Sequence, residues 1–372
     1  MGMVAFLKFN HYSGAMVSDE EFWSLRFRRK LYSDNMHSLL DEEIADALNM
    51  EVVYGGTGYP SFNHEIIMKT REQILEKFQK KSGKHNKGDS LKTVADVAKI
   101  ALEEMHKILR RRIDLRMKFY YGFTSDDLNR GFFEENSDRY NIAQEGVKKK
   151  ALDMAAGKEP SRLMKNIFKS RAAIFGFDQE NGVTGYYLDP ENHVICFNYE
   201  GWEAIGAGKY ASGLCLGQYL NRKSLRMRKE GYDRVEGVYE LIAAGIISSD
   251  SYHEAGGNIN IVYIDSTEKS HFTRYREIFD TNARLAGEIV RAQLAGVLEK
   301  QSAVKLLDQL LFQSGNPEIV ESELFQKASN KMHLELVLRG YKLDEIPFIL
   351  NSESVKNNSK KSISSKKLGG IR

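Results

Sequence analysis

Residues 4–19, VAFLKFNHYSGAMVSD, have the pattern of a β-hairpin. Two largely apolar runs, Val4–Phe9 and Ser13–Ser18, are separated by the turn-forming residues 10–12. Asp19 ends the second run. The pattern starts with the first residues of the sequence, and no basic region, apolar run and cleavage site precede it. We therefore expect a strand at the N-terminus and no secretory leader.

The composition is that of a globular protein without a strong charge bias. Of 372 residues, 42% are hydrophobic, and 54 Lys and Arg against 51 Asp and Glu leave a net charge of +3. So small a charge does not favour nucleic acid or an anionic membrane as a partner. The two cysteines, Cys196 and Cys215, suit a reducing compartment. On this cysteine usage we expect a cytoplasmic protein, and no apolar stretch is long enough to span a bilayer.

The order of the expected elements favours antiparallel sheets with helices packed outside them. Two long helices, Ser61–Lys81 and Ser90–Tyr121, have apolar residues at helical spacing and separate two groups of strands. This grouping differs from the strict alternation of a parallel α/β sheet. The other expected strands are Glu51–Tyr54, Arg171–Phe177, Val183–Leu188, Val194–Tyr199 and Asn258–Asp265, and the other expected helices are Gly206–Leu220, Val235–Ile247, Phe272–Phe312 and Glu321–Arg339.

Four local sequences together resemble the proteasome β-subunit and HslV branch of the N-terminal-nucleophile hydrolases. They are VAFLKFNHYSGAMVSD (4–19), VVYGGTGYPSF (52–62), IFGFDQENGVTGYYLDPENHVICFNYEGWEAIGAGKYASG (174–213) and DSYHEAGGNINIVYID (250–265). The last two are the more specific, because each fixes several residue types together with their expected secondary structure.

The resemblance implies an α+β fold, the four-layer α-β-β-α sandwich of that family, over residues 1–300. A helical insertion is expected at about 82–161 and a helical C-terminal extension at 301–350. Residues 351–372 have the composition of a disordered basic tail.

The chemistry of this family resides at the N-terminus of the mature chain. A Thr, Ser or Cys there attacks the peptide carbonyl, while its own free α-amino group takes the proton. The resemblance places Asp19 beside that terminus, Lys30 as the lysine that lowers the pKa of the nucleophile, Gly55 as the oxyanion donor and Asp250 as the second aspartate.

The reactive group itself has no counterpart in this sequence. Met1, Gly2 and Met3 contain no nucleophile, and Ala207 and Ala255 stand where the family has two serines. The resemblance therefore implies a ring-forming, self-compartmentalising subunit without its own peptidase activity.

Two alternatives stay open. The chain is an active threonine-type peptidase or related amide hydrolase if its start is processed or if another residue, such as Ser13, is the nucleophile. It is a monomeric binding module if the fold is kept without the ring. In the ring interpretation the partners are further copies or related proteasome-like subunits, with a polypeptide as substrate. We expect no cofactor, metal, nucleic acid or membrane.

Three other patterns favour structural roles. Gly206–Ala211 satisfies GxGxxA, with Glu230 downstream, but no strand runs directly into the first glycine as a dinucleotide site requires. His64-Glu65 and His253-Glu254 lack the HExxH spacing that places two imidazoles on one helical face. The basic stretch 106–118 predicts a solvated or partner-facing helix, because no aromatic platform or second basic element accompanies it.

Overall fold

The computed structural model describes residues 2–19, 21–24, 29–32, 35–82, 91–158, 165, 167–191, 196–197, 201–252, 258–278 and 280–338. Met1, Ala255 with its neighbours 253–257, and the expected tail 351–372 lie outside these residues. Within the described part of the chain, no helix is both long enough and apolar enough to cross a bilayer.

Five antiparallel strands form a first sheet, in the order β12-β1-β2-β13-β14. Its centre is the hairpin expected from the sequence, β1 (Met3–Lys8) and β2 (Ser13–Asp19). β13 (Ile259–Asp265) pairs with β2, while β12 (Trp202–Gly206) and β14 (Tyr275–Ile278) form the two edges.

A second antiparallel sheet has the order β11-β10-β9-β6-β5. Its strands are β5 (Met36–Ser38), β6 (Glu51–Thr57), β9 (Arg171–Asp178), β10 (Gly182–Leu188) and β11 (Cys196–Phe197). The prediction that a strand ends at Gly55 is wrong, because β6 continues through both glycines and pairs with β9 along its whole length.

The remaining elements are two hairpins and the helices. The hairpins are β3 (Glu21–Ser24) with β4 (Arg29–Tyr32), and β7 (Phe132–Glu135) with β8 (Asp138–Asn141). The helices are α1 (Glu42–Leu48), α2 (Pro60–Ser82), α3 (Val94–Tyr121), α4 (Ser125–Arg130), α5 (Glu145–Ala155), α7 (Lys209–Arg222), α8 (Leu225–Glu230), α9 (Arg234–Ser251), α10 (His271–Arg274), α11 (Asp280–Leu294), α12 (Lys300–Leu311), α13 (Pro317–Lys327) and α14 (Lys331–Val337).

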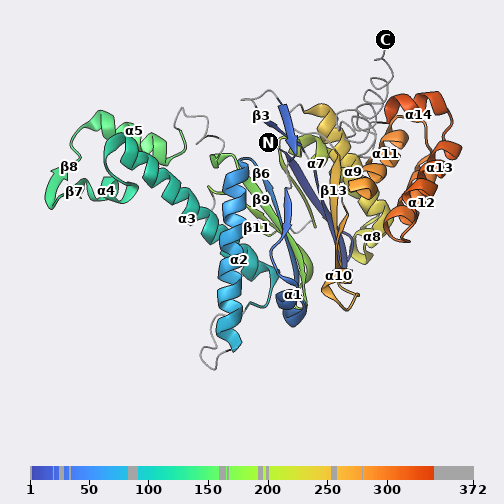
Figure 1. Ribbon diagram of the computed structural model, residues 1–372, viewed down its shortest axis with the longest axis horizontal. Coiled ribbons are helices and arrows are strands. Elements are labelled where there is room, and N and C mark those ends of the chain that lie inside the picture. The colour runs from blue at the N-terminus through green and yellow to red at the C-terminus, as the bar shows by residue number, and fades with distance from the viewer. Residues whose placement is uncertain are drawn as a thin grey trace, which may run out of the picture.

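The two sheets face each other, and helices cover their outer faces (Figure 1). Between the sheets, Phe6 of β1 stacks on Phe175 of β9 at 5.0 Å between ring centroids, within a cluster of buried residues from both sheets. A second cluster joins the first sheet to α7, α9, α11 and α12, and a third joins the second sheet to α2 and α3. The expected α+β class with antiparallel sheets is confirmed.

Two helices of the prediction are broken. The expected helix Glu321–Arg339 is wrong, because α13 ends at Lys327 and α14 begins only at Lys331. The expected helix Phe272–Phe312 is wrong, because residues 275–278 form β14 and pair with β13, after which α11 and α12 follow separately. Gly296, in the left-handed region with φ 74°, lies between the two helices. Tertiary pairing with an existing sheet edge thus overrides the helical pattern at its first turn.

Candidate functional site

The beginning of β1 and the end of β2 lie side by side because the two strands are antiparallel. The backbone N–H of Met3 donates to Oδ1 of Asp19 at 2.7 Å, and both residues are fully buried. A buried carboxylate requires such donors, since an unpaired one would carry a large desolvation cost. Asp19 therefore lies against the first residues of the chain, where the resemblance places it.

Gly2 is enclosed on two sides. A β-carbon on Gly2 would lie 2.5 Å from Oδ1 of Asp19 and 2.9 Å from Nδ2 of Asn35. On its other side, the Gly2 carbonyl accepts from the N–H of Ala207 at 3.1 Å. It also contacts Gly206, whose φ of 96° and close approach to this carbonyl leave no room for a β-carbon.

Asn35 is a site residue that the sequence did not reveal. Its Nδ2 donates to the backbone oxygen of Asp19 at 2.9 Å and to Oδ1 at 3.3 Å. The backbone carbonyl of Asn35 accepts from the N–H of Gly56 at 2.8 Å, and this bond connects the site to the second sheet. The single available signal was a polar residue directly before a short strand. Because the carboxamide is neutral, it supplies no positive charge to this site.

Gly55 occupies a packing position between the sheets. A β-carbon there would meet Cγ1 of Val4 at 2.6 Å and Sδ of Met16 at 2.8 Å. Both contacts come from the first sheet, so a glycine lets β6 approach β1 and β2 closely. Gly55 thus lies in the facing sheet, against Val4 and Met16, and the absence of its side chain allows the two sheets to pack closely.

Two other predicted residues, Asp250 and Ser13, lie away from Asp19. Asp250, near the end of α9, forms an ion pair with Arg291 of α11 at 3.2 Å, and its side chain is about half exposed. Ser13 begins β2 and therefore lies at the opposite end of that strand from Asp19, roughly 20 Å away at about 3.3 Å per residue. Lys30 pairs with Trp23 between β4 and β3, and its side chain is outside the described atoms.

A pocket of about 190 Å³ adjoins Asn35. Its polar wall is formed by Asn35, His37, Tyr54, Asn63 and His64, from β5, β6 and α2. The Tyr54 hydroxyl donates to Oδ1 of Asn63 at 3.0 Å, and burial raises the pKa of Tyr54, so its phenol stays protonated. Amide and imidazole groups at this wall suit a small polar ligand or a polar side chain. Across the described ranges, no group of three or more His, Cys, Asp or Glu side chains is arranged to hold a metal ion.

Comparison with known proteins finds similarity in structure alone. No family model and no curated protein matches the sequence. Among solved structures, the chain is similar to Anbu (ancestral β-subunit) from Yersinia bercovieri, with a TM-score of 0.50 at 8% identity. The match covers 79% of this chain and 93% of that one. At this identity the likeness shows the fold, which is proteasome-like, and no more.

Proposed function

We propose that this chain is a divergent proteasome-like subunit whose fold serves assembly and whose N-terminal site no longer hydrolyses peptides. The observation that carries the proposal is the hydrogen bond from the Met3 amide to Asp19 at 2.7 Å. In the family that the sequence resembles, the group beside this aspartate is a free amine on a nucleophilic residue. Here it is an amide, because Gly2 precedes Met3.

An amide nitrogen cannot do the chemistry of an α-amino group. Its lone pair is delocalised into the carbonyl, so it does not accept the proton of an attacking hydroxyl. Neither neighbouring position provides a nucleophile instead. Gly2 has no room for a β-carbon between Asp19 and Asn35, and the Met3 side chain is buried in the apolar cluster between the first sheet and its helices.

The contact between Asn35 and Asp19 agrees with a structural role for this aspartate, because Asn35 donates both to its backbone oxygen and to its carboxylate. We propose Asp19 as the relict residue of the site, with Lys30 and Gly55 as relict supporting residues and Asp250 now paired with Arg291.

The fold of the sandwich supports the part of the proposal that concerns assembly. Two facing sheets with helices on both outer faces support the four-layer α-β-β-α arrangement over residues 1–300, with 82–161 as an insertion and 301–350 as an extension (Figure 1). The neighbour's description as an ancestral β-subunit supports a ring of such subunits.

Peptide hydrolysis tests the catalytic half. Purified protein is incubated with fluorogenic peptides that have basic, acidic and apolar residues before the scissile bond, beside the isosteric variant Asp19→Asn. We expect no release above the blank from either protein. Hydrolysis by the unmodified chain that is lost in Asp19→Asn would overturn the proposal, because it would show a working site at this aspartate.

Native mass spectrometry tests the assembly half. We expect a closed oligomer of identical subunits at micromolar concentration. A monomer at every concentration tested would instead favour the binding-module alternative.

A further inference from the structure

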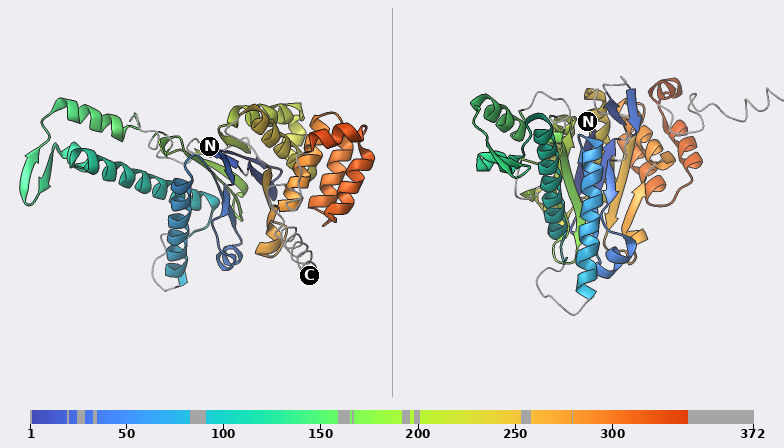
Figure 2. Two further views of the ribbon diagram at one scale, coloured as in Figure 1. Left: turned by 45° about the horizontal axis from the view of Figure 1, so that its top comes forward. Right: turned by 60° about the vertical axis from the view of Figure 1, so that its left-hand side comes forward.

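The distal half of α3 carries an arm that stands away from the sandwich (Figures 1 and 2). The arm, defined here as residues 107–155, comprises the end of α3 with α4, the β7–β8 hairpin and α5. Its buried residues continue the cluster that joins the second sheet to α2 and α3. Within the arm, Phe123 lies 6.0 Å from Phe133, and Phe133 stacks on Tyr140 at 5.3 Å between centroids. Few side chains of residues 107–155 are buried, so the arm presents most of its surface to solvent.

One face of the arm is apolar and uncovered. Leu115 is 64% exposed and Phe119, one helical turn further along α3, is 83% exposed. Residues four apart lie on the same side of a helix, so the two form a continuous apolar stripe. Two large side chains exposed in series on one helix are typical of a contact surface.

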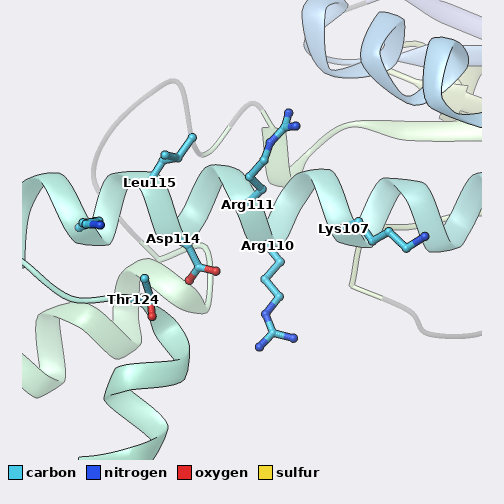
Figure 3. Close-up of a pocket in the computed structure, with 7 residues that line it drawn as sticks. Lys107, Arg110, Arg111, Asp114, Leu115 and Thr124 are labelled. Atoms are coloured by element: carbon cyan, nitrogen blue, oxygen red, sulfur yellow. The ribbon is translucent and has the colours of Figure 1, made fainter. Parts of the chain in front are cut away.

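Cations border this stripe. Arg111 and Lys118 lie within a helical turn of Leu115, and all three line a shallow hollow of about 350 Å³. Figure 3 shows Arg111 and Leu115 projecting to the same side of α3, with Arg110 on the other side. Residues 106–118 hold six Lys and Arg residues against one acidic residue. Four of the six form ion pairs with carboxylates of the same chain, namely Lys107, Arg110, Arg111 and Arg112. We call the side chains of Arg111, Leu115, Lys118 and Phe119 the basic-apolar face.

The tip of the same arm has the opposite charge. Glu134, Glu135 and Asp138 are exposed around the β7–β8 turn, and Tyr140 beside them is 46% exposed. Within the described part of the chain, neither Glu134 nor Glu135 forms an ion pair, and neither does Lys118. We call Glu134, Glu135, Asp138 and Tyr140 the acidic tip.

We infer that the arms of two copies of this chain pair with each other, the acidic tip of one against the basic-apolar face of the other. The two surfaces complement each other in charge, and each contains large apolar or aromatic side chains for the dry centre of a contact. Because both surfaces belong to one chain, a second copy offers the complementary set for each. This inference rests on the assembly half of the proposed function and names one of its contacts.

Charge reversal on each side gives the sharpest test. Lys118→Glu makes the basic-apolar face more acidic, whereas Glu134→Lys with Glu135→Lys makes the tip basic. In either variant alone, like charges meet in every pair of arms, so we expect the dissociation constant of the arm contact to rise roughly tenfold at low salt. When the two variants are mixed, every tip again meets a face of opposite charge, and assembly should return to the unmodified level. Sedimentation velocity and native mass spectrometry measure both.

Replacement of the apolar side chains by serine tests the centre of the contact independently. Leu115→Ser with Phe119→Ser removes side chains that are exposed in the single chain, so folding should be kept while the contact weakens by roughly a hundredfold. Circular dichroism checks the fold. Lys331→Glu and Glu335→Lys, on the exposed face of α14, are matched charge reversals that should leave assembly unchanged.

The outcomes separate this inference from the ring proposal. Assembly that persists unchanged in all arm variants overturns the arm contact and leaves the ring. Failure of the mixed variants to recover also overturns it. An unmodified chain that stays monomeric, or whose arm binds only a different protein or a nucleic acid, overturns the pairing of two copies, and the monomer overturns the ring as well.

Discussion

Gly2 determines what the N-terminal site can contain. Its two immediate neighbours, Asp19 and Asn35, leave no space for a β-carbon, and its carbonyl is fixed by Ala207. The residue that follows, Met3, points into an apolar cluster. Asp19, Asn35 and Ala207 therefore hold the backbone of residues 2 and 3 in place, and the site is a structural junction between β1, β2 and the second sheet.

Substitution of Gly2 should be costly for stability. Gly2→Ala forces its new methyl group against Asp19 and Asn35, and we expect the free energy of unfolding to fall by about 1–3 kcal/mol, as for other overpacked sites. Denaturant unfolding measures it. Gly287→Ala in α11, where a β-carbon meets no atom within 4 Å, is the control and should be stabilised by about 0.5–1 kcal/mol. Equal effects of the two substitutions would contradict the enclosed position of Gly2.

At the scale of single residues, the sequence revealed part of the site. Asp19 is predictable because a hairpin of antiparallel strands returns its last residue to the first. Asn35 is not, since its role depends on where the three-residue strand β5 joins the second sheet. The prediction of Asp250 as a site residue used a local pattern. Its contact with Arg291 depends on how α9 packs against α11, which that pattern does not specify.

Among the elements, α3 connects the sandwich to the arm, so its first turn must be well anchored. Thr93 caps the helix through the backbone N–H of Asp96, whose carboxylate accepts in return from the N–H of Thr93. Asp178, at the end of β9, accepts from the N–H of Val94 at 2.9 Å and so joins the helix to the β9–β10 turn.

Asp178 should matter more than the cap itself. Asp178→Ala leaves the N–H groups of Val94, Glu180 and Asn181 without their buried acceptor, and we expect a loss of about 2–4 kcal/mol in unfolding free energy. Thr93→Ala removes one acceptor and should cost about 1 kcal/mol. A chemical denaturation series compares the two. A larger loss of unfolding free energy in Thr93→Ala would show that the hydrogen bonds of Asp178 contribute little to stability.

Long elements were predictable from sequence and short ones were not. The hairpin, α2 and most of α3 follow from periodic apolar residues over many positions. The edge strands β12 and β14 are four or five residues long, and their pairing is set by strands distant in the sequence, so a local pattern does not specify them. The arm hairpin β7–β8 is too polar to show strand alternation, so the sequence predicts only a helical insertion there.

On the scale of the whole molecule, the two sheets are joined by a buried ionic cluster at the end away from the N-terminus, near α1 and α10 (Figure 1). Arg274, which is 2% exposed, donates to Glu51 of β6 at 3.0 Å and to Asp46 of α1 at 2.7 Å. His271 contacts the second oxygen of Glu51 at 2.8 Å and stacks on Tyr275. The cluster fixes the relative position of the two sheets at this end of the molecule.

This cluster should make stability depend on pH. Burial raises the pKa of Glu51 above its ordinary value of 4.5, although His271 and Arg274 act against the rise. Glu51 therefore binds its proton more tightly in the folded than in the unfolded state. Its contribution to stability is full below pH 4.5 and is lost as the pH rises through its raised pKa, by at most about 1.4 kcal/mol per pH unit.

Glu51→Gln isolates this effect because glutamine does not titrate. We expect the difference in unfolding free energy, unmodified chain minus variant, to fall as the pH rises from 4.5 and then to level off. Asp46 does not interfere in this range. Burial opposes the change, but the hydrogen bond from Arg274 lowers the pKa of Asp46, so its contribution is lost only as the pH falls below about 3.8. A difference that rises with pH above 4.5 would show that the cations outweigh the burial of Glu51.

The α+β class and the proteasome-like character of the fold were accessible from sequence, because four separated stretches resemble that family in the expected order. The placement of the arm was not, because no local pattern specifies the direction in which the distal half of α3 leaves the sandwich. The central claim concerns what this fold still does: a proteasome-like subunit that assembles without cleaving peptides.

The most direct measurement is the intact mass of the protein after incubation with a peptidyl epoxyketone, an electrophile that captures an N-terminal hydroxyl or thiol together with its amine. The amide at Met3, held on Asp19, offers neither group, so we predict an unchanged mass. Stoichiometric addition of one inhibitor, absent in Asp19→Asn, would contradict the account.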